Sequence, residues 1–267
     1  MFLTFLISVP LVANWLDQAE RHFFGVKPGV TIAGENLGGL LADEVRLAVE
    51  ELAVREQVLP LEPRLDKQTG TIIPGRNGRI LDIENTVSRI LSATESQRLK
   101  PEMITIYPRY TAADLQKIKR VLGYCETGVS GTYQRHSNIS LASSAVNNTV
   151  VWPGEVFSFN ETVGPRTPER GYLPAPVILM GGGGMDFGGG VCQVSSTIYN
   201  AALSSGLRIV ERHPHSRPVR YVPAGRDATV NYGYLDLKIL NNRPEPVIIK
   251  CGLSRGRVWA SVYGGGE

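Results

Sequence analysis

Apolar and polar residues along the chain follow two different periods, and each period predicts a different kind of element. Apolar side chains recur three and four positions apart at 45–52 and at 83–91, which predicts two amphipathic helices. Apolar runs bounded by turn residues predict short strands at 30–32, 61–65, 71–73 and 103–107. Residues 25–108 are therefore expected to form a small α+β domain, and no residue in it suggests catalysis.

The same helical period continues after this domain. Thr111 and Asp114 have the spacing of a capping box, and the apolar residues that follow extend the pattern to Gly123. Residues 109–131 are accordingly expected to form a linker helix and loop. Asn138 is the expected cap of a further helix.

Beyond Pro153 the chain becomes rich in predicted strands. They fall at 156–159, 177–180, 208–211, 219–222, 228–232, 235–240, 247–251 and 258–263. The last three alternate closely enough to form an antiparallel meander. The helix expected after Cys192 would pack on this sheet. The predicted fold class is α+β, with residues 132–267 forming a mostly antiparallel domain that carries Cys192 at the N-terminus of a packed helix, preceded by the small α+β domain.

The first sixteen residues of the chain are almost entirely apolar, but they contain Pro10 and Asn14 and no Lys or Arg. They are shorter than a membrane span of roughly 20 residues. The positively charged start of a signal peptide is also missing. Residues 1–24 are expected to be either a short signal anchor or an ordinary N-terminal helix, and the apolar character favours export.

Composition narrows the classes of function. The net charge is +3 with no run of Lys or Arg, so nucleic acid is not an expected partner. The three cysteines show no C-x-x-C spacing and the four histidines no zinc pattern, so no metal is expected. Phosphate-binding glycine motifs are absent, so no nucleotide cofactor is expected either. A disulfide between Cys125 and Cys251, with Cys192 free, and three reduced thiols both remain open.

The stretch 181–206 is the most unusual part of the chain. Seven glycines in ten residues lead into the helix that begins near Cys192 and ends before Gly206. In the first turn of a helix, unpaired N–H groups and the positive end of the dipole favour a thiolate. Cys192 is therefore a candidate nucleophile, and a small packed apolar residue is the alternative. The glycines are equally compatible with a mobile wall of a cleft and with a plain tight connection.

Residues that could serve such a nucleophile follow it in the chain. His213 and His215 come just after a predicted strand, and Asp227 opens a later one. Papain-like and transglutaminase-like thiol enzymes use this order of cysteine, histidine and carboxylate. An imidazole can take the thiol proton, a carboxylate can hold its tautomer, and Gln193 can add a donor for an oxyanion. Each residue taken alone also fits a loop or turn without a catalytic role.

Several long blocks resemble the VanW-domain proteins, named from vancomycin-resistance clusters, over about Thr132 to Gly264. The blocks are Trp152-Pro-Gly-Glu-Val-Phe-Ser-Phe-Asn160, Val163-Gly-Pro-Arg-Thr167, Gly188-Gly-Gly-Val-Cys-Gln-Val-Ser-Ser-Thr197, Ile209-Val-Glu-Arg-His-Pro-His-Ser216, Tyr221-Val-Pro223 and Gly225-Arg-Asp-Ala-Thr-Val230. Residues 25–108 look, more weakly, like the peptidoglycan-binding-type module that often precedes these domains.

This resemblance implies a bacterial cell-envelope protein, anchored in the membrane with the domain outside. Some family members are understood to act as cysteine-dependent L,D-transpeptidases that make 3-3 crosslinks in peptidoglycan, while much of the family has no established activity. Carried onto this sequence, the nucleophile is Cys192, the base is His213 or His215, and His215 is preferred because of its His-Ser-x-Pro-Val block.

The resulting hypothesis is acyl transfer between peptidoglycan stem peptides, with no cofactor. Arginines at 166 and 217 are candidate docking groups for peptide carboxylates, which a guanidinium pairs bidentately. The full candidate binding set is Arg166, Gly189, Gly190, Gln193, Ser195, Ser196 and Arg217. The competing hypothesis is a non-catalytic wall-binding or scaffold protein in which Cys192 is merely packed. The sequence leaves the oligomeric state open.

Overall fold

The computed structural model describes residues 5–179 and 182–265. The chain folds into two compact units, the first from Met1–Glu62 and Gly75–Arg109 and the second from Pro63–Pro74 and Tyr110–Glu267. The short segment Pro63–Pro74 belongs to the second unit, although it precedes the boundary expected at 108. It joins the second unit because the side chains of Asn147 and Asn148 donate hydrogen bonds to its backbone carbonyls.

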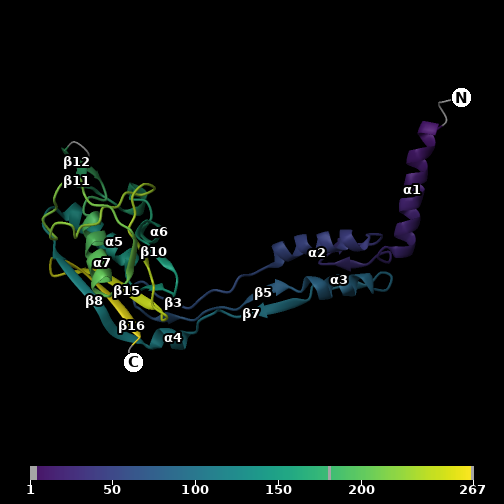
Figure 1. Cartoon of the computed structure of the whole chain (residues 1–267), viewed down its shortest axis with the longest axis horizontal. Helices are drawn as coiled ribbons and strands as arrows, with labels where there is room; N and C mark the ends of the chain where they lie inside the picture. Colours follow the sequence, from purple (N-terminus) through teal and green to yellow (C-terminus); the bar gives the residue numbers. More distant parts are fainter. Residues whose placement is uncertain (1–4, 180–181, 266–267) are drawn as a thin grey trace. The chain divides into compact units, whose positions relative to one another are not determined.

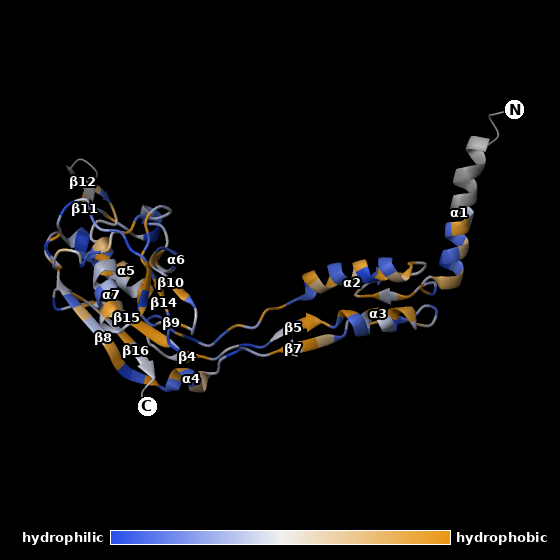
Figure 2. Ribbon diagram, in the orientation of Figure 1, coloured by the Kyte–Doolittle hydropathy of each residue, from blue (hydrophilic) through white to orange (hydrophobic). Residues whose placement is uncertain are grey.

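The first unit contains the two predicted amphipathic helices. Its elements are α1 (Phe5–Phe24), β1 (Thr31–Ile32), β2 (Glu35–Asn36), α2 (Ala42–Glu56), β5 (Gly78–Leu81), α3 (Ile83–Leu91), β6 (Arg98–Leu99) and β7 (Met103–Ile106). Polar and apolar residues alternate around α2 and α3 (Figure 2), and the two helices pack on each other through buried residues such as Val49 and Ile90. The α+β prediction for this part of the chain is confirmed.

The N-terminal helix α1 starts at Phe5, so the first four residues of the apolar stretch at 1–16 lie outside the described residues. Trp15, Leu16, Phe23 and Phe24 are exposed large apolar side chains of this helix. Of the helices in the described part of the chain, none combines the length and apolarity that a membrane span requires.

The second unit is built from antiparallel strands and the helices that cover them. Its elements are β3 (Arg64–Leu65), β4 (Ile72–Ile73), α4 (Ala112–Gln116), β8 (Ile118–Gly128), α5 (Tyr133–Val146), β9 (Thr149–Val151), β10 (Val156–Ser158), α6 (Phe159–Val163), a 3₁₀ turn at Pro168–Arg170, β11 (Pro174–Leu179), β12 (Gly182–Phe187), α7 (Val191–Ser204), β13 (Arg208–Glu211), β14 (Lys238–Leu240), β15 (Val247–Ser254) and β16 (Arg257–Gly265).

A four-stranded sheet in the order β8-β16-β15-β9 forms one layer of this unit, and β10-β14-β13 form a smaller sheet. All of their pairings are antiparallel. Figure 1 shows α5 and α7 lying over the larger sheet, where α7 contacts β8 and β16. The predicted packing of this helix on the sheet is therefore confirmed. The predicted meander is correct for β15 and β16 only, because β14 pairs in the smaller sheet.

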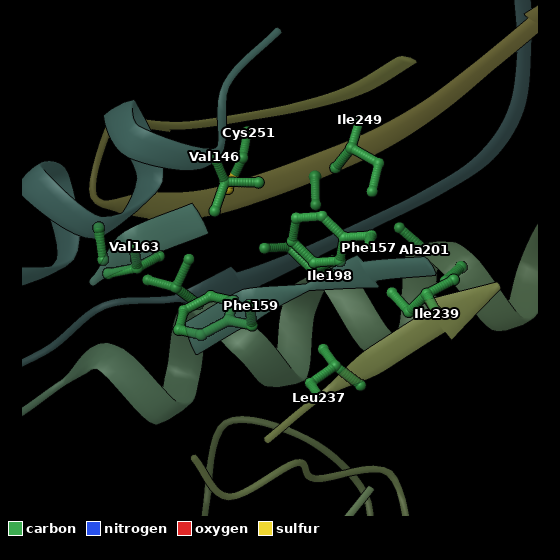
Figure 3. Packing of buried hydrophobic residues seen from close by; sticks show 14 of the residues in the cluster. Val146, Phe157, Phe159, Val163, Ile198, Ala201, Leu237, Ile239, Ile249 and Cys251 are labelled. Carbon is green, nitrogen blue, oxygen red and sulfur yellow. The ribbon is translucent and has the colours of Figure 1, made fainter. Parts of the chain in front are cut away.

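The core of the second unit lies between these layers. Phe157 and Phe159 pack against Ile198 of α7, together with Ile239 from the small sheet and Ile249 from the large one (Figure 3). All five side chains are at most 3% exposed. Because residues of α7 are fully buried here, the first turn of this helix is held rigidly at the edge of the core.

The expected linker helix is wrong beyond its first turn. Thr111 and Asp114 do form the capping box, with the Asp114 carboxylate accepting a 2.9 Å hydrogen bond from the Thr111 N–H. The helix ends at Gln116, however, and residues 118–128 form β8, paired with β16 along almost its whole length. Apolar residues at helical spacing here also fit one face of a long strand, and pairing with β16 decides between the two.

The predicted strands at 219–222 and 228–232 are also wrong, and the one predicted at 235–240 is correct only for Lys238–Leu240. The residues before Lys238 form loops with isolated bridges such as His213 to Thr229. Their backbone groups bond to side chains instead. For example, Ala228 N donates to Ser196 Oγ at 2.8 Å and Ala228 O accepts from Ser195 Oγ at 2.7 Å.

The disulfide between Cys125 and Cys251 is excluded by strand register. Both residues pair with Ala260, from opposite sides of β16, so a whole strand lies between them. Two strand spacings are about 9.6 Å, whereas bridged cysteines have Cα atoms within about 7 Å. All three cysteines are free thiols.

Asn138 does not cap α5 as predicted. Thr132 is the cap, and Asn138 lies inside the helix with a fully buried side chain. Its amide donates to Leu173 O at 2.8 Å and Gly189 O at 3.1 Å and accepts from Leu173 N at 2.8 Å. It thereby fixes the glycine loop that leads into α7.

We expect Asn138→Ala to destabilise the protein by about 2 kcal/mol, because it leaves buried backbone groups of Leu173 and Gly189 without partners. Urea unfolding followed by circular dichroism measures this loss. Ser140→Ala, at an exposed position of the same helix, is the matched control and should change the free energy of unfolding by less than about 0.5 kcal/mol. Equal stability of the two variants would contradict the assignment.

Candidate functional site

Cys192 lies in the first turn of α7, which the chain enters through closely packed glycines. Gly190 is the cap residue at φ +108°, and a Cβ there would come 2.9 Å from Ile139 Cγ1. A Cβ on Gly189 would come 2.6 Å from Ala175 O. These glycines are thus required by close packing and backbone conformation. Cys192 is the second residue of the helix and is partly exposed.

The Cys192 thiol has two polar neighbours from the loops after β13. Its Sγ lies 3.5 Å from Val230 O, which accepts a hydrogen bond from it. The thiol is also close enough to the ring of His215 to raise the pKa of that ring. His215 Nδ1 is 2.6 Å from Asp227 Oδ2, so Nε2 is the ring nitrogen left for the thiol. The structure therefore brings Cys192, His215 and Asp227 together.

Asp227 is held in place from several directions. Its Oδ2 accepts from the His215 backbone N–H at 2.6 Å, and its Oδ1 accepts from Arg212 Nη2 at 2.9 Å. Arg212 Nε also donates to the Asp227 carbonyl at 2.6 Å. Burial opposes ionisation of this carboxyl, but the hydrogen bonds from His215 outweigh it and lower its pKa. Asp227 is thus an ionised, oriented acceptor.

Two effects oppose each other at the His215 ring, whose side chain is 7% exposed. Burial alone would lower its pKa, and the hydrogen bonds with Cys192 and Asp227 more than reverse this, so the pKa of His215 lies above its ordinary value. Tyr221 packs edge-on against the ring, at 6.4 Å between centroids. The ring has one orientation, with its two nitrogens directed at two different partners.

The other candidate histidine is not part of this group. His213 Nε2 lies 3.0 Å from Glu211 Oε1, and its side chain is 38% exposed. The backbone of His213 forms an isolated β-bridge with Thr229, in the loop after Asp227. The structure therefore distinguishes the two histidines and leaves His215 as the only one that contacts the thiol among the described residues.

Three predicted binding residues of α7 have other partners. Both N–H groups of the Gln193 amide are donated within the fold, to Thr127 Oγ1 at 3.0 Å and Gly128 O at 2.8 Å, so none is left for an oxyanion. The hydroxyls of Ser195 and Ser196 are fully buried and donate to Cys192 O at 3.1 and 2.7 Å. These side chains hold the helix start and do not face the thiol.

The glycine-rich stretch is not a loop over its whole length. Residues Gly182–Phe187 form β12, which pairs with β11 as an antiparallel hairpin, and residues 180–181 lie outside the described residues. Only Gly188 to Gly190 form the turn into α7. The two candidate docking arginines also differ: Arg217 is exposed, whereas the guanidinium of Arg166 is buried near Cys192.

Comparison with known proteins identifies the domain. The family described as VanW like protein matches residues 134–263. The chain is 40% identical to the uncharacterized protein YoaR of Bacillus subtilis over 73% of this chain and 66% of that protein. It is 31% identical to the vancomycin B-type resistance protein VanW of Enterococcus faecalis over 43% of this chain and 45% of that protein.

This chain belongs to the VanW-domain family. It spans about two thirds of YoaR and less than half of VanW. No solved structure matches it significantly. The resemblance to VanW-domain proteins is confirmed, and Cys192, His215 and Asp227 lie inside the matched residues.

The VanW domain also contributes polar residues near Cys192 that sequence reasoning missed. Arg135 Nη2 donates to Gln193 Oε1 at 2.7 Å, and the negative charge of a Cys192 thiolate raises its pKa against the lowering by burial. Burial raises the pKa of Tyr221, which also lies close to Cys192 and Ser196. Tyr221 and Arg212 fall inside the motif blocks, which was an available signal. No sequence feature marks Arg135.

The start of α7 offers one backbone donor beside the thiol. Across the described part of the chain, no carbonyl accepts a hydrogen bond from the Cys192 N–H, whereas the N–H groups of Val191 and Gln193 bond to Gly188 O and Gly190 O. An unpaired N–H at a helix N-terminus can stabilise a developing oxyanion. Within the same residues, no group of three or more His, Cys, Asp or Glu has the arrangement of a metal site.

Proposed function

We propose that the VanW domain is a cysteine acyltransferase that acts on peptidoglycan stem peptides in the manner of an L,D-transpeptidase. The observation that carries this proposal is the proximity of the Cys192 thiol to His215, whose Nδ1 is held by Asp227. A thiol with an oriented imidazole and an unpaired N–H beside it has the groups that acyl transfer needs. The choice of stem peptides rests on the family resemblance.

In the first half of the proposed reaction, the Cys192 proton passes to His215 Nε2 and Sγ attacks the carbonyl carbon after the third stem residue. The resulting oxyanion accepts a hydrogen bond from the Cys192 N–H. When the tetrahedral intermediate collapses, the C–N bond breaks and His215 returns the proton to the leaving amine of the terminal D-amino acid. A thioester remains on Cys192.

In the second half, an amine on a neighbouring stem attacks the thioester carbonyl and gives its proton to His215. The C–S bond breaks, the new amide forms a 3-3 crosslink, and the proton returns to the Cys192 sulfur. Water as the acceptor would make the same machinery a carboxypeptidase. Asp227 keeps Nδ1 protonated throughout, which leaves Nε2 free for each transfer.

We further propose that the domain works outside the cytoplasmic membrane, as a cell-envelope protein attached through residues 1–24. The exposed apolar side chains of α1 support attachment at a lipid surface. Fractionation of cells that express the full chain tests this, and recovery only in the cytosolic fraction would contradict it.

Thiol reactivity tests the nucleophile with controls that the protein itself contains. We expect iodoacetamide at pH 7 to label Cys192 at least about tenfold faster than the other two thiols. Burial raises the pKa of Cys251 to about 12 and also raises the pKa of Cys125, so both are poor nucleophiles at this pH. Mass spectrometry of the peptides measures the three rates. Labelling of Cys192 no faster than Cys125 would support the packed, non-catalytic alternative.

Product analysis tests the reaction. The protein is incubated with muropeptides that carry tetrapeptide stems, and released D-alanine and new 3-3 dimers are measured by liquid chromatography and mass spectrometry. Both products should be absent with Cys192→Ala. If the intact protein forms neither product and no thioester on Cys192, the acyltransferase proposal fails.

A further inference from the structure

Arg166 is a partly exposed residue whose guanidinium end is buried in the described part of the chain. Both terminal nitrogens of its guanidinium, Nη1 and Nη2, are inaccessible to solvent and make no hydrogen bond. Its Cζ lies near two aromatic rings, 5.5 Å from the centroid of Phe159 and 5.9 Å from that of Tyr232. Guanidinium groups stay charged in proteins, and burying an unpaired charge is costly. An anion that enters this site would remove that cost.

A carboxylate close to Arg166 already has other partners. Asp236 is close enough for its charge to raise the pKa of Arg166 against the lowering by burial. Its oxygens already accept hydrogen bonds from the Ser158 hydroxyl and from the backbone N–H groups of Asn160 and Leu237. No salt bridge forms between the two side chains among the described residues. Arg166 is thus left for an external partner.

Arg166 is also next to the thiol. Its stem packs on the turn that starts α7, since a Cβ on Gly188 would come 2.8 Å from Arg166 Cγ. The negative charge of a Cys192 thiolate raises the pKa of Arg166 as well. The turn from Gly188 to Gly190 therefore leads directly to Cys192 and also contacts Arg166.

Tyr232 is the more accessible of the two rings near Arg166. It is 47% exposed, whereas Phe159 is fully buried. Tyr232 lies on a turn closed by hydrogen bonds between Asn231 and Leu235. Because Tyr232 is exposed and lies on a turn, its ring can move with less disturbance of the core than the ring of Phe159.

We propose that Arg166 binds the free terminal carboxylate of the acyl donor, with Tyr232 moving aside to admit it. This inference rests on the proposed function and names the donor more narrowly: a peptide whose terminal carboxylate lies one residue beyond the bond that Cys192 attacks. A guanidinium holds a carboxylate through two parallel hydrogen bonds. The site therefore selects removal of a terminal residue over cleavage within a longer peptide.

The test compares two probes that differ only at the terminal group. A synthetic stem tetrapeptide ending in D-alanine, and the same peptide with that carboxyl amidated, are titrated calorimetrically into the Cys192→Ala protein. We expect the acid to bind about 10- to 100-fold more tightly, the range for hydrogen bonds to a charged partner. Arg166→Met should remove this preference. Arg208→Met, at an exposed arginine outside the candidate binding set, is the matched control and should retain it.

The comparison of acid and amide in the protein with Arg166 intact decides the proposal even if Arg166→Met fails to fold, which its circular dichroism spectrum would show. Equal affinity for the two probes, or binding of neither, overturns it, as does a preference that survives in folded Arg166→Met. A preference for the acid without any thioester on Cys192 in the intact protein would keep the carboxylate site and refute the proposed catalysis. A thioester on Cys192 without a preference for the acid would support the proposed catalysis and refute the carboxylate site.

Discussion

Replacing His215 with glutamine is expected to lower turnover of a tetrapeptide stem by about 10²- to 10⁴-fold, the usual contribution of a general base. Glutamine keeps the backbone N–H that bonds to Asp227 but has no nitrogen that can take the thiol proton. Release of D-alanine and the rate of iodoacetamide labelling at Cys192 both measure the loss. The labelling rate is informative even if the natural acceptor has not been identified.

His213→Gln is the matched control for this substitution. His213 stands two residues earlier, pairs with Glu211, and has a side chain that is 38% exposed. Its loss should change turnover by no more than about twofold, as for most substitutions at the surface. An equal loss in both variants, or full activity of His215→Gln, would show that the imidazole next to Cys192 is not the base.

Replacing Asp227 with asparagine is expected to lower turnover by up to about 10⁴-fold, the size of effect seen when a catalytic carboxylate that orients histidine is replaced by an amide. An amide nitrogen in place of Asp227 Oδ2 would face His215 Nδ1 as a donor and favour the tautomer with the proton on Nε2. That tautomer cannot accept the thiol proton. Comparison of turnover in the variant and the native chain gives the result.

The same substitution predicts a change in the pH profile. His215 must be neutral to act as the base, and because its pKa is raised, the acid limb of the native profile should lie above about pH 6.5. Asp227 contributes to that elevation, so the limb of Asp227→Asn should move to lower pH. If the acid limb of Asp227→Asn lies at the same pH as that of the native chain, the assignment of Asp227 as the partner of His215 is contradicted.

Stability gives an independent measure of the Asp227 carboxylate. Its pKa is lowered in the folded protein, so its stabilising effect is complete above the unfolded value near pH 3.9 and is lost as the pH falls through the folded value. The native chain should therefore be more stable than Asp227→Asn at pH 7. This difference should shrink in acid, where thermal unfolding of both proteins can be compared.

Sequence periodicity was sufficient to predict those elements whose apolar pattern fits only one kind of secondary structure. The helices α2, α3 and α7 and the hairpin of β15 and β16 were predicted because their apolar spacing, caps and turn residues agree with one another. Residues 118–123 show the limit of this reasoning. Their apolar positions fit both a helix face and a strand face, and only the partner strand β16 decides between them.

The candidate site was likewise predictable only in part from the sequence. Cys192 at a helix start, and a histidine and Asp227 after it, could be inferred from the order of residues along the chain. The choice of His215 over His213 could not, because it depends on which ring reaches Asp227 and the thiol across a loop that forms no regular strand. The glycines, Gln193 and the serines were predicted to meet substrate, but they bond and pack within the fold.

The sequence by itself determined the family, the α+β class, the helix that carries Cys192 and the set of residues from which a base could come. The tertiary structure alone decided that Asp227 orients His215 and that β8 is a strand. It also decided that the terminal nitrogens of Arg166 are buried without a hydrogen-bond partner among the described residues. The physical reason is the range of the interactions. Helix caps and apolar spacing act over a few neighbouring residues, whereas the site depends on hydrogen bonds and burial between segments far apart in the chain.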